Sequence, residues 1–177
     1  SAITDTGATG PVELNIQSGR NMTLSTVTLD GSGNVTLDID FDTGVDGGST
    51  LTALALTAGN IEIEGQSSTS DTLNANGDIT SSGALTVLNV STVILDTNVD
   101  LIANNGNIDA NTNIQLLGTG TSTNLIQASD DVVLSTVTDP SSIGPIEFNL
   151  RAGGNITLGQ VDLNNNNAPV LDIDLDT

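Results

Sequence analysis

The sequence predicts an all-β fold, a right-handed parallel β-helix (a β-solenoid) with coils of about 22 residues. Three observations favour this fold: a long internal repeat, a shorter period within it, and apolar residues that alternate with polar ones. An antiparallel β-sandwich is the alternative.

The long repeat is the clearest feature. Residues 1–43 align with residues 135–177 without a gap, at an offset of 134, and 19 of the 43 aligned positions are identical. Thus GPVELNIQSGRNMTLSTVTL matches GPIEFNLRAGGNITLGQVDL, and LDIDFDT matches LDIDLDT. The sequence therefore divides into one full repeat, residues 1–134, and the start of the next, residues 135–177. We expect the natural protein to continue the pattern, in the same chain or in a second subunit.

A shorter period lies inside the long one. LSTVTLD begins at Leu24, VSTVILD at Val90 and LSTVTD at Leu134, so the separations are 66 and 44 residues, both multiples of 22. A period near 22 residues is usual for one coil of a parallel β-solenoid. Six such coils contain about 132 residues, close to the offset of the long repeat.

Strand-like runs are separated by clusters of Gly, Asn, Asp and Ser, which tolerate the tight corners between strands. The expected strands include 12–16, 22–29, 35–41, 51–56, 61–63, 85–88, 93–95, 114–117 and 132–137. No stretch shows the 3.6-residue apolar period of an amphipathic helix, so we expect almost no helix.

The nature of the apolar residues favours a solenoid over a sandwich. Phe41 and Phe148 are the only aromatic residues, whereas a sandwich usually fills its core, ~10 Å thick, with Trp, Tyr or Phe. A narrow solenoid is filled by stacked Leu, Ile and Val. The two repeats exchange these residues like for like, as in Val12 and Ile146, which suits such stacks.

The composition argues against several functions. The net charge is −20, with Arg20 and Arg151 as the only cations, so we expect no binding to nucleic acid. We expect both arginines to pair with nearby acids. No run approaches the ~20 apolar residues of a membrane span, so we expect no membrane insertion. The lack of His, Cys, Lys and Tyr leaves few catalytic groups, and we expect no enzyme activity.

The aspartates of LDIDFDT raise the question of a calcium site. Asp-x-Asp-x-Asp can start an EF-hand loop, but Thr43 and Ser49 stand where that loop needs Gly and Glu. Alternate side chains of a strand lie about 6.6 Å apart, so one straight strand cannot surround an ion with three carboxylates.

Two interpretations of these aspartates therefore stay open. In the first, they form a solvated strand face opposite an apolar one. In the second, residues of the following turn join carboxylates of the neighbouring coil, ~4.8 Å away, around a cation, for which Ca²⁺ is the candidate. The candidate metal ligands are Asp38, Asp40, Asp42, Asp46, Asp172, Asp174 and Asp176.

Short Gly-Asn phrases recur along the chain: GRNMTL, GNVTL, AGNIEI, GDIT, GNIDA and GGNITL. Together with LALTAGNIEIEG at 54–65, they resemble the repeat regions of filamentous haemagglutinin-like exoproteins, which are large bacterial surface or secreted proteins. The resemblance implies a long parallel β-helix in an adhesin, a fibre or an envelope layer.

These observations lead to a functional hypothesis. We expect a structural repeat segment of an extracellular prokaryotic fibre, filament or surface layer, located outside the cell or on its surface. Its coils would stack through backbone edges and apolar rows, so the expected partners are further copies, end to end or side by side, and divalent cations. The alternatives are the stalk of a cell-surface adhesin with its binding tip elsewhere, or a calcium-binding repeat module.

Overall fold

A computed structural model describes residues 2–5, 10–29, 35–44, 48–66, 70–118, 120–140, 144–163 and 169–176. These residues form strands and corners, with no helix among them. The strands are β1 (Ile3–Asp5), β2 (Val12–Ser18), β3 (Met22–Leu29), β4 (Val35–Phe41), β5 (Thr50–Ala58), β6 (Asn60–Glu64), β7 (Thr72–Ala75), β8 (Ile79–Ser81), β9 (Leu85–Leu88), β10 (Thr92–Leu95), β11 (Leu101–Ala103), β12 (Ile108–Leu116), β13 (Ser122–Ala128), β14 (Val132–Thr138), β15 (Ile146–Ala152), β16 (Ile156–Asp162) and β17 (Val170–Leu175).

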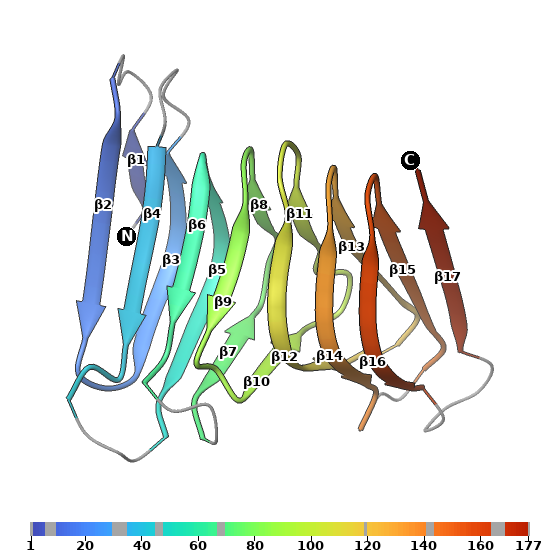
Figure 1. The fold of residues 1–177 in the computed structure, drawn as a ribbon. Coiled ribbons are helices and arrows are strands. Elements are labelled where there is room, and N and C mark those ends of the chain that lie inside the picture. The colour runs from blue at the N-terminus through green and yellow to red at the C-terminus, as the bar shows by residue number, and fades with distance from the viewer. Residues whose placement is uncertain are drawn as a thin grey trace.

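The strands stack into a single β-solenoid of about six turns (Figure 1). Each described strand pairs in parallel with strands of the neighbouring coils, which excludes the antiparallel sandwich. The stack has three faces. In the view of Figure 1, β2, β4, β6, β9, β12, β14 and β16 form the front, β7 and β10 lie on the lower face, and β8, β11, β13, β15 and β17 form the back.

The solenoid is right-handed, as the sequence predicts. In Figure 1 the front strands run downwards and the back strands run upwards, while the chain advances from left to right. The N-terminus and the C-terminus therefore lie at opposite ends of the stack (Figure 1).

The coils are slightly longer than the sequence predicts. Along the front face Leu37 lies opposite Ile61, and Ile61 lies opposite Leu85, so each step takes 24 residues. On the lower face the step falls to 20 residues, from Leu73 to Val93. The observed coil of about 24 residues is thus close to the expected period of about 22, and its length varies because corners of different length separate strands that stay in register.

The long repeat spans five and two-thirds coils rather than six. Five coils separate β2 from β14 on the front face, and the chain then passes the lower face before it reaches β15 on the back. The β2–β4 pair, with Leu14 opposite Leu37, thus returns as the β15–β17 pair, with Phe148 opposite Leu171. Each repeat keeps its strand pairing but is turned by one face of the stack.

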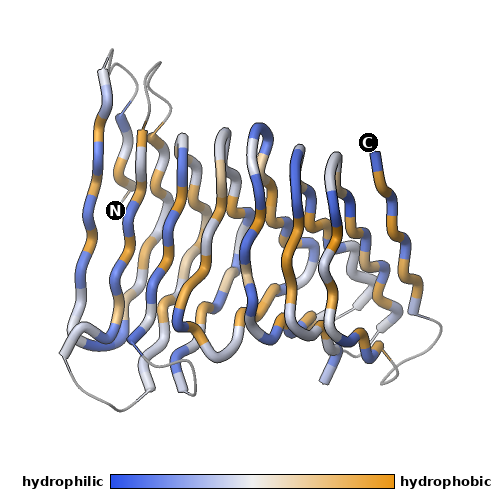
Figure 2. The backbone as a smooth tube through the Cα atoms, in the orientation of Figure 1, coloured by the Kyte–Doolittle hydropathy of each residue, from blue (hydrophilic) through white to orange (hydrophobic). Residues whose placement is uncertain are grey.

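The core is a stack of inward-pointing aliphatic side chains. Apolar and polar residues alternate along the front strands (Figure 2), and the apolar ones point inwards because successive side chains of a strand face opposite sides. Leu37, Ile39 and Phe41 of β4 are buried, and so is Phe148 of β15. The expected strands did not include β1, β7, β8, β11 and β13, most of which are short and mix apolar with polar residues.

Hydrogen bonds between coils explain the recurring Gly-Asn phrases. Where the back face turns into the front face, Asn107 Oδ1 accepts a hydrogen bond from the Asp131 N–H (3.1 Å), and Asp131 Oδ1 accepts one from the Asn155 N–H (2.7 Å). Asn60 Oδ1 accepts a bond from the Ala84 N–H in the same way (3.0 Å). Each side chain therefore satisfies a backbone donor of the next coil, which a corner would otherwise leave open.

Glycine is required at the corner between the lower and back faces, where neighbouring coils approach closely. A Cβ atom at Gly77 would collide with the carbonyl oxygen of Leu54 in the preceding coil. Within the described residues, no helix is long and apolar enough to cross a membrane.

Candidate functional site: the acidic face

The acidic residues of β4 lie on its solvent side. Asp38 and Asp40 alternate with the buried Leu37, Ile39 and Phe41. The β4 strand thus has one polar face and one apolar face, as in the interpretation of these aspartates as a solvated strand face.

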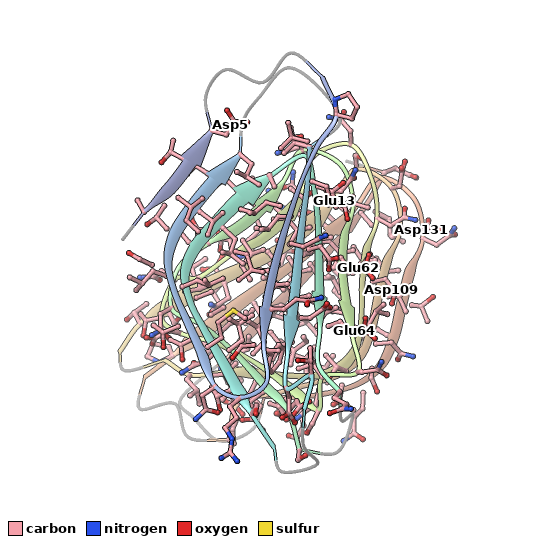
Figure 3. The ribbon with its side chains drawn as sticks, turned by 90° about the vertical axis from the view of Figure 1, so that its left-hand side faces the viewer. Asp5, Glu13, Glu62, Glu64, Asp109 and Asp131 are labelled. Atoms are coloured by element: carbon pink, nitrogen blue, oxygen red, sulfur yellow. The ribbon has the colours of Figure 1, made fainter. Side chains whose placement is uncertain are left out.

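The parallel register extends this polar row into neighbouring coils. Asp38 lies opposite Glu62, and Asp40 lies opposite Glu64. Glu13 points outwards from β2 on the same side, as Figure 3 shows together with Glu62 and Glu64. We call these five residues the acidic face. Directly opposed strands are ~4.8 Å apart, so the like charges repel one another across the coils.

Side-chain amides partly compensate this repulsion. Gln17 Nε2 donates a hydrogen bond to Asp40 Oδ2 (2.7 Å), and Asn89 Nδ2 donates one to Glu64 Oε1 (2.9 Å). An amide of the preceding coil therefore holds Asp40, and an amide of the following coil holds Glu64. A shallow hollow of about 330 Å³ lies between them, lined in part by Asp40, Glu64 and Asn89.

Asp38 and Glu62, which lie opposite each other, bind protons more tightly than such groups usually do. Partial burial raises the pKa of Asp38 above its ordinary value, and the charges of Asp40, Glu13 and Glu64 raise it further. Partial burial also raises the pKa of Glu62, followed by the charges of Asp38, Glu64 and Asp40. Burial and mutual repulsion together therefore favour the protonated forms of these two carboxyl groups.

Asp42 departs from the alternation of β4. Its backbone is left-handed (φ 68°), the residue is 1% exposed, and among the described residues its buried Oδ2 has no hydrogen-bond partner. Asp176, one repeat later, has the same left-handed backbone (φ 64°). The bend after LDIDFDT and LDIDLDT is therefore a property of the repeat. Asp46, which the sequence places at this turn, lies outside the described residues.

The second set of candidate aspartates lies on another face. Asp172 and Asp174 belong to β17 on the back of the stack, opposite Asn149 and Arg151 of β15. Arg151 Nε is 3.3 Å from Asp174 Oδ2, which makes an ion pair, although the geometry does not meet hydrogen-bond criteria. The structure therefore does not bring the two Asp-x-Asp-x-Asp segments together.

Among the side chains that the structure describes, no three acidic groups are close enough to hold a metal ion. The six candidate ligands that the structure describes are spread over the front face, the back face and the corners. Cation binding by these residues stays a prediction.

Sequence reasoning missed two buried polar residues with structural roles. Asp71 is fully buried and accepts hydrogen bonds from the backbone N–H groups of Ser49 (2.9 Å) and Gln66 (2.8 Å), which ties two coils together at a corner. Asn124 takes an inward position, and its amide donates to the carbonyl oxygens of Asp96 (3.0 Å) and Val99 (2.8 Å). Neither residue stands in a pattern that marks it as buried.

Comparisons with family models, with curated proteins and with solved structures find no match to this chain. The assignment of a β-solenoid built from repeats therefore rests on the strand pairing of the molecule itself.

Proposed function

We propose that the chain is a structural repeat segment of an extracellular prokaryotic fibre, filament or surface layer. One observation carries the proposal: the second repeat reproduces the strand pairing of the first within one uninterrupted stack. A repeat that adds coils in this way lengthens a rod without changing its cross-section.

The surface of the stack suits a rod better than a binding pocket. The acidic face is open and its carboxylates repel one another, which favours solubility over ligand capture. The resemblance of the Gly-Asn phrases to filamentous haemagglutinin-like repeats supports a location on the cell surface or outside the cell.

Immunoelectron microscopy of intact producing cells tests this role. Antibodies against the chain should label fibres or the cell envelope, and a protease added from outside should remove the label. Label confined to the cell interior would contradict the proposal. Label on a stalk that ends in a distinct tip would favour the adhesin alternative.

A further inference from the structure

Asp42 is a buried acid without a compensating partner. The residue is 1% exposed, and its Oδ2 atom has no hydrogen-bond partner among the described residues. Its left-handed backbone ends the alternation of β4, so Asp42 is buried directly after the buried Phe41. Burial of an ionised carboxylate without a partner is strongly unfavourable, because the group loses its hydration and gains nothing in exchange. This bend therefore needs a compensating group.

Asp71 shows how the same fold satisfies a buried carboxylate. It accepts hydrogen bonds from the backbone N–H groups of Ser49 (2.9 Å) and Gln66 (2.8 Å). Asp42 Oδ2 has no such donor in the described part of the chain. Protonation would remove the charge of Asp42, but it would bury an O–H donor that needs an acceptor of its own. A cation compensates the charge and coordinates the oxygen at the same time.

A hollow that offers oxygen atoms adjoins this bend. It has a volume of about 330 Å³, and the two chain neighbours of Asp42, Phe41 and Thr43, both line it. Its oxygen-bearing side chains are Asp40, Thr43, Glu64, Gln66 and Asn89. The buried carboxylate therefore lies next to a space with further ligand atoms for a cation.

Two carboxylates of the hollow are already held in place. Asp40 Oδ2 accepts a hydrogen bond from the Gln17 amide (2.7 Å), and Glu64 Oε1 accepts one from the Asn89 amide (2.9 Å). Each bond uses one oxygen atom of its carboxylate, so the second oxygen can bind a cation. Asp40 and Glu64 also lie opposite each other and repel one another. A bound cation replaces this repulsion with attraction.

We propose that the bend after β4 binds a calcium ion, with Asp42 as its buried charged ligand. Among the described side chains no three acidic groups gather around one point. Neutral oxygen atoms, such as the Thr43 hydroxyl and the Gln66 amide oxygen, and water molecules therefore complete the coordination. Ca²⁺ accepts six to eight oxygen ligands of this mixed kind, roughly 2.3–2.6 Å away, in flexible geometry.

The chemistry of the ligands selects a hard cation. The chain has no His and no Cys, so it offers oxygen ligands in place of the imidazole and thiolate groups that transition metals prefer. Mg²⁺ demands a nearly ideal octahedron and gives up its water reluctantly. An irregular set of carboxylate, hydroxyl and amide oxygens suits Ca²⁺ better.

The equivalent bend of the second repeat provides an internal comparison. Asp176 has the same left-handed backbone as Asp42, but it is exposed to solvent. Water can hydrate its carboxylate, so Asp176 needs no cation. The site thus depends on burial of the aspartate and not on the repeat sequence alone. An ion at Asp42 stabilises a bend within one coil, which goes beyond the proposed role of the chain as a rod.

Thermal unfolding of the purified protein, followed by circular dichroism, tests the site. We expect the Tm of the parent chain to be about 5–10 °C higher at a calcium concentration roughly 100-fold above Kd than in a chelator. Asp42→Asn should lose this response, and asparagine tolerates the left-handed backbone. In the chelator this variant should unfold at a higher temperature than the parent, because it removes an uncompensated charge. The matched control, Asp176→Asn, should keep the full calcium response.

Isothermal titration with calcium chloride tests the ligands of the hollow. Glu64→Gln should weaken the affinity by about 10–100-fold, as the loss of a group that supports a bound metal does. Glu13→Gln removes a charge of the acidic face outside the hollow and should leave the affinity nearly unchanged. Magnesium chloride should bind more weakly than calcium chloride to the parent chain. This test stands even if Asp42→Asn does not fold.

Three results would overturn the inference: a parent chain that neither binds calcium nor gains stability from it, an Asp42→Asn variant that binds calcium like the parent, or a Glu64→Gln variant with unchanged affinity. An Asp42→Asn variant that is less stable than the parent in the chelator would also overturn it, since the carboxylate would then be satisfied by the protein itself. A cell-surface rod that ignores calcium overturns the site alone. A chain confined to the cell interior overturns the proposed function, whatever its calcium binding.

Discussion

Arg151 and Asp174 form an ion pair between adjacent coils, with Nε 3.3 Å from Oδ2. One repeat earlier the same two positions are Gln17 and Asp40, which share a hydrogen bond of 2.7 Å. The repeat therefore conserves a link between coils while the chemistry of its donor changes. The expectation that Arg151 pairs with a nearby acid is confirmed.

Arg151→Gln tests whether the amide can replace the guanidinium. Both side chains of the ion pair are more than 40% exposed, so solvent screens the pair, and we expect a change in the free energy of unfolding below about 1 kcal/mol. Urea unfolding in low and high salt measures the change. A loss of several kcal/mol would show that the pair does more than link two exposed strands.

Ile39 and Ile173 occupy the same repeat position but differ in exposure, 0% against 44%. Ile39→Ala should cost about 2–5 kcal/mol, because it leaves a cavity in the packed core. Ile173→Ala should cost about 1 kcal/mol or less, because half of that side chain is already in water. Urea unfolding of dilute protein, where copies do not associate, compares the two variants. Equal costs would contradict the strand order described here.

Asp131 supports the corner between coils, since its Oδ1 accepts the backbone N–H of Asn155. Asp131→Ala should remove both hydrogen bonds that Oδ1 accepts from Asn155, one from the backbone N–H and one from the side-chain amide, and cost about 1–3 kcal/mol, the net value of two hydrogen bonds. Asp131→Asn keeps an acceptor oxygen and is the matched control. Hydrogen exchange at the Asn155 amide should accelerate in the alanine variant only. Equal exchange in both variants would rule out the side-chain acceptor.

The raised pKa values of Asp38 and Glu62 predict a pH dependence. The folded state holds these protons more tightly than the unfolded chain, so burial of the ionised groups, and then their mutual repulsion, costs stability when both are ionised. That cost is present above the folded pKa values and disappears as pH falls towards the ordinary values of 3.8 and 4.5.

The variant Asp38→Asn/Glu62→Gln removes this repulsion. At pH 7 we expect it to be more stable than the parent chain by roughly 0.2–1 kcal/mol, the range for cross-strand charge pairs. The difference should shrink as pH approaches 4.5. A variant that is less stable at pH 7 would show that the carboxylates attract a counter-ion instead, as the calcium alternative requires.

Much of the fold could be predicted from the sequence, for physical reasons that particular residues show. Alternation in LDIDFDT determines which side of β4 is buried, because a strand has a period of two. The number of coils in a repeat could not be predicted, because the STV phrases that begin at Leu24, Val90 and Leu134 lie at bends of the chain and not on one fixed face. The buried Asp71 was also beyond prediction, because its partners are backbone groups of other coils.

Electron microscopy and diffraction of aligned purified protein, with and without a calcium chelator, test the central claim most directly. The stacked coils predict thin rods with an axial spacing of ~4.8 Å. Rods that survive chelation would support a solenoid held by its own strand pairing and apolar core. Rods that break into short pieces would assign the aspartates to a cation-dependent joint. Globular particles without the axial spacing, in either condition, would contradict the solenoid rod.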